Sequence, residues 1–268
     1  MRWLVAAAAA YLVVVLLLAW FQDRLVYFPE ARYVTNPGEW GLAYHDVTFS
    51  AADGVDLSAW YVPSGGKRGA ILYCHGNGGN ISYRYEYLKV FHDLGFSTLM
   101  FDYRGYGKSE GRPSEQGTYL DAAAAWDYLV EQMGVSATDI VLYGESLGGA
   151  VASWLARARS PRALVLQSAF TSLPDIGAEI YPFLPVRLIA RHRYNTLDHL
   201  SAVRCPVLIV HSRDDEIVPF AHAVRLHAAV SGPRDFLELR GDHNSGVMQS
   251  VERFKNGLNA FLGKHPVP

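Results

Sequence analysis

A strand-to-helix turn with a serine at its apex constrains the fold of this 268-residue chain more than any other feature. An apolar run at 140–143 stops at Gly144, and a helical pattern covers about 149–158. Ser146 lies between them in the G-x-S-x-G spacing of a nucleophile elbow. Such a turn is sharp and strained, and glycines remove the Cβ atoms that would collide. The pattern predicts an exposed serine hydroxyl beside the amide of Leu147 and the positive end of a helix dipole.

Short strand patterns alternate with helical patterns along most of the chain. Eight apolar runs have the length and composition of strands, and they lie at 44–50, 56–62, 70–74, 97–101, 140–143, 163–167, 207–211 and 236–239. Helical patterns lie near 82–94, 117–133, 146–158, 220–230 and 247–262. This alternation predicts an α/β fold with a mostly parallel eight-stranded sheet and helices on both faces. A turn signal at 52–54 predicts an antiparallel hairpin at one edge.

The N-terminal segment 1–22 is predicted to be a transmembrane anchor. The 19 residues at 3–21 contain no charged residue, glycine or proline, and as a helix they span about 28 Å, close to a bilayer core. Trp3 and Trp20 suit the two membrane interfaces. A signal peptide needs a small-residue cleavage site, which 17–23 lacks, and a core helix is seldom apolar on every face. We expect a single-pass anchor, in the inner membrane of a bacterium, with too few flanking charges to predict the side on which the domain lies.

The rest of the chain divides into a linker and a domain. We expect an irregular linker at 23–43 that packs through its aromatic residues, followed by the α/β domain at 44–264. About forty residues separate the strands at 163–167 and 207–211, which is too long for a plain crossover. They predict a short cap at about 170–200. The cap contains an apolar stretch whose candidate substrate contacts are Tyr181, Phe183, Leu184 and Leu188.

An elbow serine that transfers acyl groups needs an acid and a base at the same sheet edge, in the order serine, acid, histidine. Asp214 and Asp215 follow the seventh predicted strand, and His243 follows the eighth. Since parallel strands end at one edge, these side chains are expected beside Ser146. Only one of the two adjacent carboxylates can face His243, and the local pattern leaves that choice open.

A glycine-rich loop after the third predicted strand is the candidate for the other half of an oxyanion hole. The loop reads Cys-His-Gly-Asn-Gly-Gly-Asn at 74–80. Its glycines allow a close backbone approach, and the amide of Asn77 can face the amide of Leu147 across the site. Nucleotide binding is the alternative for such a loop, but neither a G-x-G-x-x-G spacing nor a following Lys-Ser/Thr is present.

Composition excludes several other classes of function. The net charge is −2 and the chain has no basic stripe, which argues against a nucleic-acid partner. Its two cysteines, Cys74 and Cys205, form no C-x-x-C motif and no cluster with histidine. We therefore expect no metal, no cofactor and no disulfide framework. The sequence makes no prediction about the oligomeric state.

Five motifs in a fixed order resemble those of the α/β-hydrolases over about residues 40–262. They are HGNGGN at 75–80, DYRGYGKS at 102–109, GESLGG at 144–149, SRDDEIVP at 212–219 and GDHN at 241–244. The resemblance is strongest to a branch with an N-terminal membrane anchor and a short cap. That branch includes eukaryotic protein depalmitoylases and many bacterial members without assigned substrates.

The resemblance implies roles for individual residues. The family's acid loop usually reads His-Gly-x-x-Asp-x-x-Val-Pro, and laid on 211–219 it implies that Asp215 is the acid. Ser212 then stands where the family has glycine. Asn77 and Leu147 are implied as the oxyanion amides.

Together these patterns predict a serine hydrolase that cleaves carboxylic esters or thioesters of acyl or lipid-like substrates. Catalysis is expected through Ser146, His243 and Asp215 and an acyl-enzyme. One alternative is a serine peptidase, since the chain more distantly resembles serine aminopeptidases and prolyl-oligopeptidase-type domains. No carboxylate pair for an N-terminal amine is evident, however. Another alternative is a non-catalytic, membrane-anchored binding module on the same fold, against which the complete triad argues.

Overall fold

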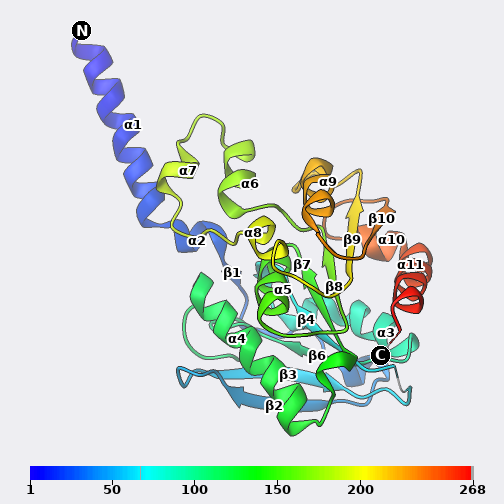
Figure 1. Cartoon of the computed structure of the whole chain (residues 1–268). Helices are drawn as coiled ribbons and strands as arrows, with labels where there is room; N and C mark the ends of the chain where they lie inside the picture. Colours follow the sequence, from blue (N-terminus) through cyan, green and yellow to red (C-terminus); the bar gives the residue numbers. More distant parts are fainter. Residues whose placement is uncertain (67, 267–268) are drawn as a thin grey trace.

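An eight-stranded sheet forms the centre of the computed structural model, which describes residues 1–66 and 68–266 (Figure 1). The strand order is β10-β9-β8-β7-β4-β6-β3-β2. The strands are β2 (His45–Ser50), β3 (Asp56–Val62), β4 (Ala70–Cys74), β6 (Ser97–Phe101), β7 (Ile140–Glu145), β8 (Ala163–Gln167), β9 (Val207–Ser212) and β10 (Arg234–Leu239). Strand β3 pairs antiparallel with β2 and β6, and the other pairs are parallel. The prediction of a mostly parallel eight-stranded α/β sheet is confirmed.

Helices cover both faces of the sheet (Figure 1). One face packs against α4 (Glu115–Asp127), α5 (Leu147–Ala158), α8 (Thr196–Leu200) and α9 (Phe220–Ala229). The other packs against α3 (Tyr85–Asp93), α10 (Gly246–Gln249) and α11 (Val251–Lys264). Successive strand side chains point to opposite faces, so Leu72 of β4 joins the first core while Ile71 and Tyr73 join the second. Because both faces are covered, β4 reads as a continuous apolar run rather than an alternating one.

Three of the expected helices differ in detail from the prediction. The expected helix at 117–133 is α4 followed by a π-helical turn, η3 (Tyr128–Gln132). A 3₁₀ turn, η2 (Ile81–Arg84), precedes α3, and a further 3₁₀ turn, η4 (Ala137–Asp139), precedes β7. The last expected helix is divided at Ser250 into α10 and α11.

The segment at 23–43 is more ordered than the expected irregular linker. It contains most of α2 (Gln22–Val26), then β1 (Phe28–Pro29) and the 3₁₀ turn η1 (Pro37–Trp40). Strand β1 pairs in parallel with β5 (Gly78–Gly79) in a second, two-stranded sheet. Its neighbour Tyr27 is buried in the domain core. The segment after α1 is therefore fixed directly against the glycine-rich loop.

Helix α1 (Arg2–Trp20) projects away from the body of the domain (Figure 1). Val15 is its one buried residue. With a mean hydropathy of 2.4, it is the one described helix that is long and apolar enough to cross a bilayer, a property that signal sequences share. Of the two cap helices, α7 (Val186–Ile189) lies beside α1 and α6 (Leu173–Ile180) lies farther from it, both above the carboxyl ends of the strands (Figure 1).

Candidate active site

Ser146 occupies a strained turn between β7 and α5. Its φ of 51° and ψ of −114° are sparsely populated for a residue with a side chain. The turn is held by its neighbours, since the Ser146 amide donates to the Gln167 carbonyl of β8 at 2.8 Å. A Cβ on Gly144 would lie 2.5 Å from the Gly148 carbonyl oxygen, and one on Gly148 would collide with the Cys74 carbonyl oxygen. The two glycines are therefore required by close backbone contacts on both sides of the serine.

The structure brings Ser146, His243 and Asp215 into one hydrogen-bonded row. His243 Nε2 lies 3.2 Å from Ser146 Oγ, and His243 Nδ1 lies 2.8 Å from Asp215 Oδ2. The three residues follow β7, β10 and β9, whose carboxyl ends meet at one edge of the sheet. In this geometry the ring can accept the serine proton on Nε2 while Asp215 fixes the proton on Nδ1.

The acid loop orients Asp215 and turns its neighbour away. Asp215 Oδ1 accepts hydrogen bonds from the amides of Val218 at 2.7 Å and Ile217 at 3.0 Å. Asp214 is instead exposed, and its Oδ1 lies 3.4 Å from an Arg240 guanidinium nitrogen. Of the two carboxylates that the sequence left open, Asp215 is the one that faces His243.

Two further residues support the acid loop. Buried His211 lies with Nε2 2.8 Å from the Val218 carbonyl oxygen and 3.4 Å from Asp215 Oδ2. Ser212, which stands where glycine is usual in the family, donates to the Gly241 carbonyl at 2.5 Å. This hydroxyl ties the loop of the acid to the loop that carries His243, so the departure from the family pattern adds a contact between them.

Charge and burial act in opposite directions on the triad. Burial lowers the pKa of His243, but the hydrogen bond and negative charge of Asp215 outweigh it and leave the pKa above its ordinary value of 6.5. Burial raises the pKa of Asp215. The hydrogen bond to His243 and the positive charge of its ring outweigh burial and bring the Asp215 pKa below its ordinary value. The acid is therefore ionised at neutral pH, and its negative charge favours the protonated form of the His243 ring.

These shifts predict the pH dependence of the reaction. Protonated His243 cannot accept the serine proton, so kcat/KM for an ester should fall on the acid side with a midpoint above 6.5. Asp215→Asn should lower kcat by about 10⁴-fold and move this midpoint down, since burial then acts without the opposing charge. Rates with p-nitrophenyl butyrate between pH 5 and 9 measure both effects. Asp214→Asn is the matched control, and equal profiles for the two variants would contradict the assignment.

Asn77 of the glycine-rich loop lines the same cavity as Ser146 and Leu147 of the elbow. Among the described residues, neither the Asn77 amide nor the Leu147 amide donates a hydrogen bond to another group. The rest of Asn77 is fixed, because its carbonyl accepts from the Tyr106 hydroxyl at 2.8 Å and from the Phe28 amide at 2.9 Å. Its side-chain amide donates to the Val26 carbonyl at 2.9 Å. The loop is thus held by the segment that follows the N-terminal helix.

Sequence reasoning missed an ion pair that supports this loop. Glu145, the elbow residue before the serine, accepts two hydrogen bonds from Arg84 at 3.1 and 3.2 Å and one from the Tyr73 hydroxyl at 2.7 Å. Burial raises the pKa of Glu145, but the Arg84 charge outweighs it and brings the pKa to about 2. Arg84 also donates to the Gly78 carbonyl at 2.8 Å. It therefore joins the elbow to the glycine-rich loop, although no local pattern in the sequence indicates this role.

His75 in the same loop is a structural residue. It is fully buried, its Nδ1 lies 2.6 Å from the Gly76 carbonyl oxygen, and its ring packs against Tyr103 and Tyr106. Burial lowers its pKa to about 3, so the imidazole is neutral. It braces the loop without facing Ser146.

A cavity of about 1250 Å³ opens beside the serine. Ser146, Leu147, His243 and Asn77 line its floor. The cap provides one wall through side chains of α6, α7 and the turn between them, chiefly Ile176, Ile180, Tyr181, Phe183, Leu184 and Ile189. The N-terminal segment provides the other wall through Leu18, Gln22, Leu25 and Phe28. The site is therefore a largely apolar cleft that ends at a candidate nucleophile.

The structure separates the four cap residues expected to contact substrate. Tyr181, Phe183 and Leu184 line the cavity. Leu188 does not line it, and its side chain points outward with 86% of its surface exposed. A helix as short as α7 presents apolar residues to both sides, so the apolar stretch alone did not indicate which of them face inward.

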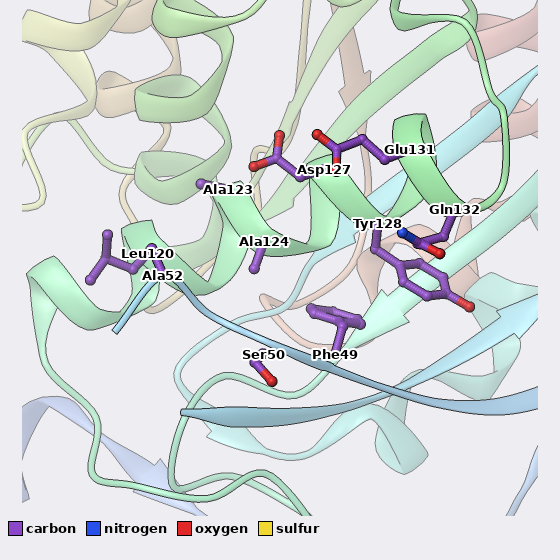
Figure 2. Close-up of a pocket in the computed structure, with 10 residues that line it drawn as sticks. All are labelled: Phe49, Ser50, Ala52, Leu120, Ala123, Ala124, Asp127, Tyr128, Glu131 and Gln132. Atoms are coloured by element: carbon purple, nitrogen blue, oxygen red, sulfur yellow. The ribbon is translucent and has the colours of Figure 1, made fainter. Parts of the chain in front are cut away.

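A second, smaller cavity of about 270 Å³ lies between β2 and α4, and no residue of the cap lines it. Figure 2 shows Tyr128 pointing from the helical segment toward Phe49 on the strand, with Asp127 and Glu131 on the same helical segment. Asp127 is paired with Arg159 at 2.7 Å, and no histidine lines this space. It offers no acyl-transfer chemistry. In the described part of the chain, no cluster of three acidic, histidine or cysteine side chains has the arrangement of a metal site.

The fold and site together are those of an α/β-hydrolase, and comparison with known proteins bears this out. A sequence model of the alpha/beta hydrolase fold matches residues 69–190. Alpha/beta hydrolase domain-containing protein WAV2 of Arabidopsis thaliana is 35% identical over 237 residues, which cover 80% of this chain and 77% of that protein. The chain therefore belongs to the α/β-hydrolase family, which confirms the resemblance seen in its motifs.

Two further proteins are similar over almost the whole chain. Uncharacterized protein Rv2307c of Mycobacterium tuberculosis is 43% identical over 252 residues, which cover 92% of this chain and 90% of that protein. The solved structure of the Pyrococcus furiosus esterase Pf2001 superimposes with a TM-score of 0.74 and 19% identity, covering 90% of this chain and 98% of that one. At this identity the likeness extends to the fold alone.

Proposed function

We propose that this protein is a membrane-anchored serine hydrolase that cleaves esters or thioesters of acyl chains. The observation that carries the proposal is the continuity between the row Ser146–His243–Asp215 and the apolar cavity of about 1250 Å³ above it. That volume exceeds the range of about 300–1,000 Å³ found for most small-ligand pockets. An apolar cleft of this size that ends at a nucleophile suits an acyl chain whose carbonyl reaches Ser146.

In the proposed first step, Ser146 Oγ forms a bond to the carbonyl carbon while its proton moves to His243 Nε2. The oxyanion accepts hydrogen bonds from the amides of Asn77 and Leu147, each worth about 3 kcal/mol of barrier. The bond from carbon to the leaving oxygen or sulfur then breaks, and His243 returns the proton to that atom. Asp215 stabilises the imidazolium throughout.

In the second step, water resolves the acyl-enzyme. His243 Nε2 takes a proton from the water as its oxygen attacks the acyl carbonyl, and the carbon–Oγ bond then breaks. The proton passes from His243 back to Ser146, and the products are a carboxylic acid and an alcohol or thiol. No group beyond the side chains described here and water is needed.

The peptidase alternative has less support from the site. An aminopeptidase needs free carboxylates to hold the substrate's ammonium group. Of the carboxylates that line the cavity, Glu145 is paired with Arg84, which leaves Glu30 as a single carboxylate rather than a pair. Nothing else in the cavity favours a cationic substrate.

A substrate panel tests the proposal. We expect the full chain in lipid nanodiscs to hydrolyse p-nitrophenyl esters and acyl-coenzyme A thioesters, and to leave aminoacyl p-nitroanilides intact. A fluorophosphonate should inhibit all of this activity, because it reacts with an activated serine. Faster release of nitroaniline than of nitrophenol would favour the peptidase, and failure to react with any substrate or with the fluorophosphonate would favour the non-catalytic binding module.

A further inference from the structure

We propose that the cap tip, defined as residues 180–189, is immersed in the membrane leaflet nearest the domain, beside the C-terminal half of α1, and that the cavity takes the acyl chain of a membrane-resident ester or thioester sideways from the bilayer. The reaction in this inference rests on the proposed function, whereas the immersion of the cap does not. The juxtaposition that carries it is the cap tip lying beside the apolar N-terminal helix (Figure 1). Residues of both elements line the cavity.

The contact between the cap tip and α1 fixes their relative depth. The Tyr11 hydroxyl donates a hydrogen bond to the Phe183 carbonyl at 2.8 Å. Tyr11 precedes Trp20, the last residue of α1, by nine residues, or about 14 Å along a helix. The cap tip therefore reaches the middle of the apolar helix, and a bilayer that covers α1 also covers the cap tip.

The polar groups at this contact are arranged for an environment without water. A tyrosine hydroxyl within an apolar span and a turn carbonyl outside any helix are both costly in hydrocarbon unless they are paired. The Tyr11–Phe183 hydrogen bond pairs them with each other. Pro182 and Pro185 also remove two backbone N–H donors from the turn, and the Leu184 amide donates within the turn to the Tyr181 carbonyl at 3.0 Å.

The outer surface of the cap tip is apolar. Leu188 is 86% exposed and Phe183 is 69% exposed, and Ile180 and Tyr181 are each about half exposed. Its single charged residue, Arg187, pairs with Asp175 on α6 at 3.1 Å, so the long side chain carries its charge back toward the base of the cap. Large apolar side chains gathered on a protruding tip are typical of a surface that contacts a membrane.

A polar collar closes the apolar region at one level on both elements. Gln22 donates to the Ile189 carbonyl at 2.6 Å and accepts from the Arg191 amide at 2.7 Å. His192 Nε2 lies 2.7 Å from Asp23 Oδ1. The apolar stretch of the anchor and that of the cap thus end side by side, at residues that prefer the headgroup region. This coincidence is expected if one membrane interface crosses both elements.

The same arrangement gives the cavity its entrance. Leu18 of α1 forms one wall, and Phe183 and Ile189 of the cap tip form the opposite one. Both walls come from elements at the depth of the hydrocarbon, so a chain moving between them toward Ser146 does not cross water. The substrate class that fits is a lipid-borne acyl ester or thioester, in which the chain enters from the leaflet and the leaving group remains at the collar.

The immersion is tested by the environment of Leu188, which lies outside the cavity. A Leu188→Cys variant is prepared in a Cys205→Ser background, because Cys205 is partly exposed whereas Cys74 is buried. The thiol is labelled with the fluorophore NBD, and the full chain is placed in phosphatidylcholine nanodiscs. The matched control carries the label at Glu131→Cys, an exposed position in η3, which follows α4.

We expect phosphatidylcholine with a nitroxide on its acyl chain to quench the label at position 188 and leave the label at 131 bright. Aqueous iodide should quench the two labels in the opposite order. Iodide quenching at 188 equal to that at 131, with no effect of the nitroxide lipid, would overturn the immersion of the cap. Fluorescence quenching does not depend on catalysis, so this experiment tests the immersion of the cap tip separately from the proposed function.

Entry from the leaflet is tested by activity in the same nanodiscs. Leu188→Glu should reduce hydrolysis of membrane-dissolved p-nitrophenyl palmitate by about tenfold or more, because it places a charge in hydrocarbon. Water-soluble p-nitrophenyl butyrate should be cleaved at the wild-type rate. Val224→Glu is the matched control on α9, where Val224 is 52% exposed, and should change neither rate. A wild-type rate on both esters for Leu188→Glu would overturn lateral entry, whereas an inactive wild-type protein would count against the proposed function instead.

Discussion

Ser146→Ala and His243→Ala are each expected to lower kcat for p-nitrophenyl butyrate by about 10⁶-fold. Ser146 is the attacking group, and His243 is the one base within hydrogen-bond reach of its Oγ, at 3.2 Å in the described structure. Without the histidine the hydroxyl stays protonated and is a poor nucleophile. Stopped assays over hours measure the residual rates, and His92→Ala, a partly exposed histidine on α3, should leave kcat unchanged.

The double variant sharpens this expectation. Because Ser146 and His243 act as a unit, removing both should lower kcat no further than removing either one. The oxyanion amides and the cavity remain in all three variants, so a residual rate of about 10³- to 10⁴-fold over water is expected. If kcat of the double variant instead fell by the product of the two single-variant factors, the two side chains would act independently. That result would contradict the assignment of a catalytic triad.

The second large effect concerns stability. Gly148→Ala should lower the free energy of unfolding by about 3 kcal/mol, which is the upper end of the range for substitutions that overpack a core. The added Cβ would lie 2.6 Å from the His75 carbonyl oxygen and still closer to that of Cys74. Both are backbone atoms, which cannot turn aside as a side chain can. The loop that carries Asn77 must therefore move, and activity should fall together with stability.

Urea unfolding of the full chain in detergent, followed by tryptophan fluorescence, measures this change. The matched control is Gly263→Ala in α11, where a Cβ meets nothing within 4 Å. Alanine there should stabilise the helix by up to about 1 kcal/mol. A Gly148→Ala variant as stable and active as the wild type would show that the elbow does not need the close approach of α5 to β4.

Sequence patterns predicted those parts of the fold that depend on the polarity and size of residues close together in the chain. Strand β4 was predicted with its observed bounds because its run of five apolar residues is typical of a parallel strand that is buried on both faces. The elbow was predicted because its glycines, Gly144 and Gly148, reflect contacts made within a few residues of Ser146. The order of Ser146, Asp215 and His243 was readable because each follows a strand, and strand ends meet at one edge.

Contacts between distant residues with no periodic signal could not be predicted. Strand β1 has only two residues, so neither alternation nor length indicated its pairing with β5. Arg84 and Glu145 are separated by 61 residues, and each alone looks like a surface charge. The structure thus shows that the Arg84–Glu145 pair supports the glycine-rich loop, and this contact arises only from the tertiary fold.

The cap shows a different limit of sequence reasoning. The stretch at 180–189 was interpreted as substrate-facing because it is apolar, and Tyr181, Phe183 and Leu184 do line the cavity. Leu188 does not line the cavity and points outward, with 86% of its surface exposed. An apolar pattern gives the preference for a non-aqueous environment but not whether that environment is a substrate or a bilayer.

The most direct test of the central claim is the site at which a fluorophosphonate reacts. The full chain in nanodiscs is treated with a slight excess of the probe, digested, and its peptides are analysed by mass spectrometry. We predict a single adduct, on Ser146, formed in parallel with loss of esterase activity and absent from Ser146→Ala. An adduct on another residue, or full labelling of Ser146→Ala, would contradict the assignment of Ser146 as the nucleophile.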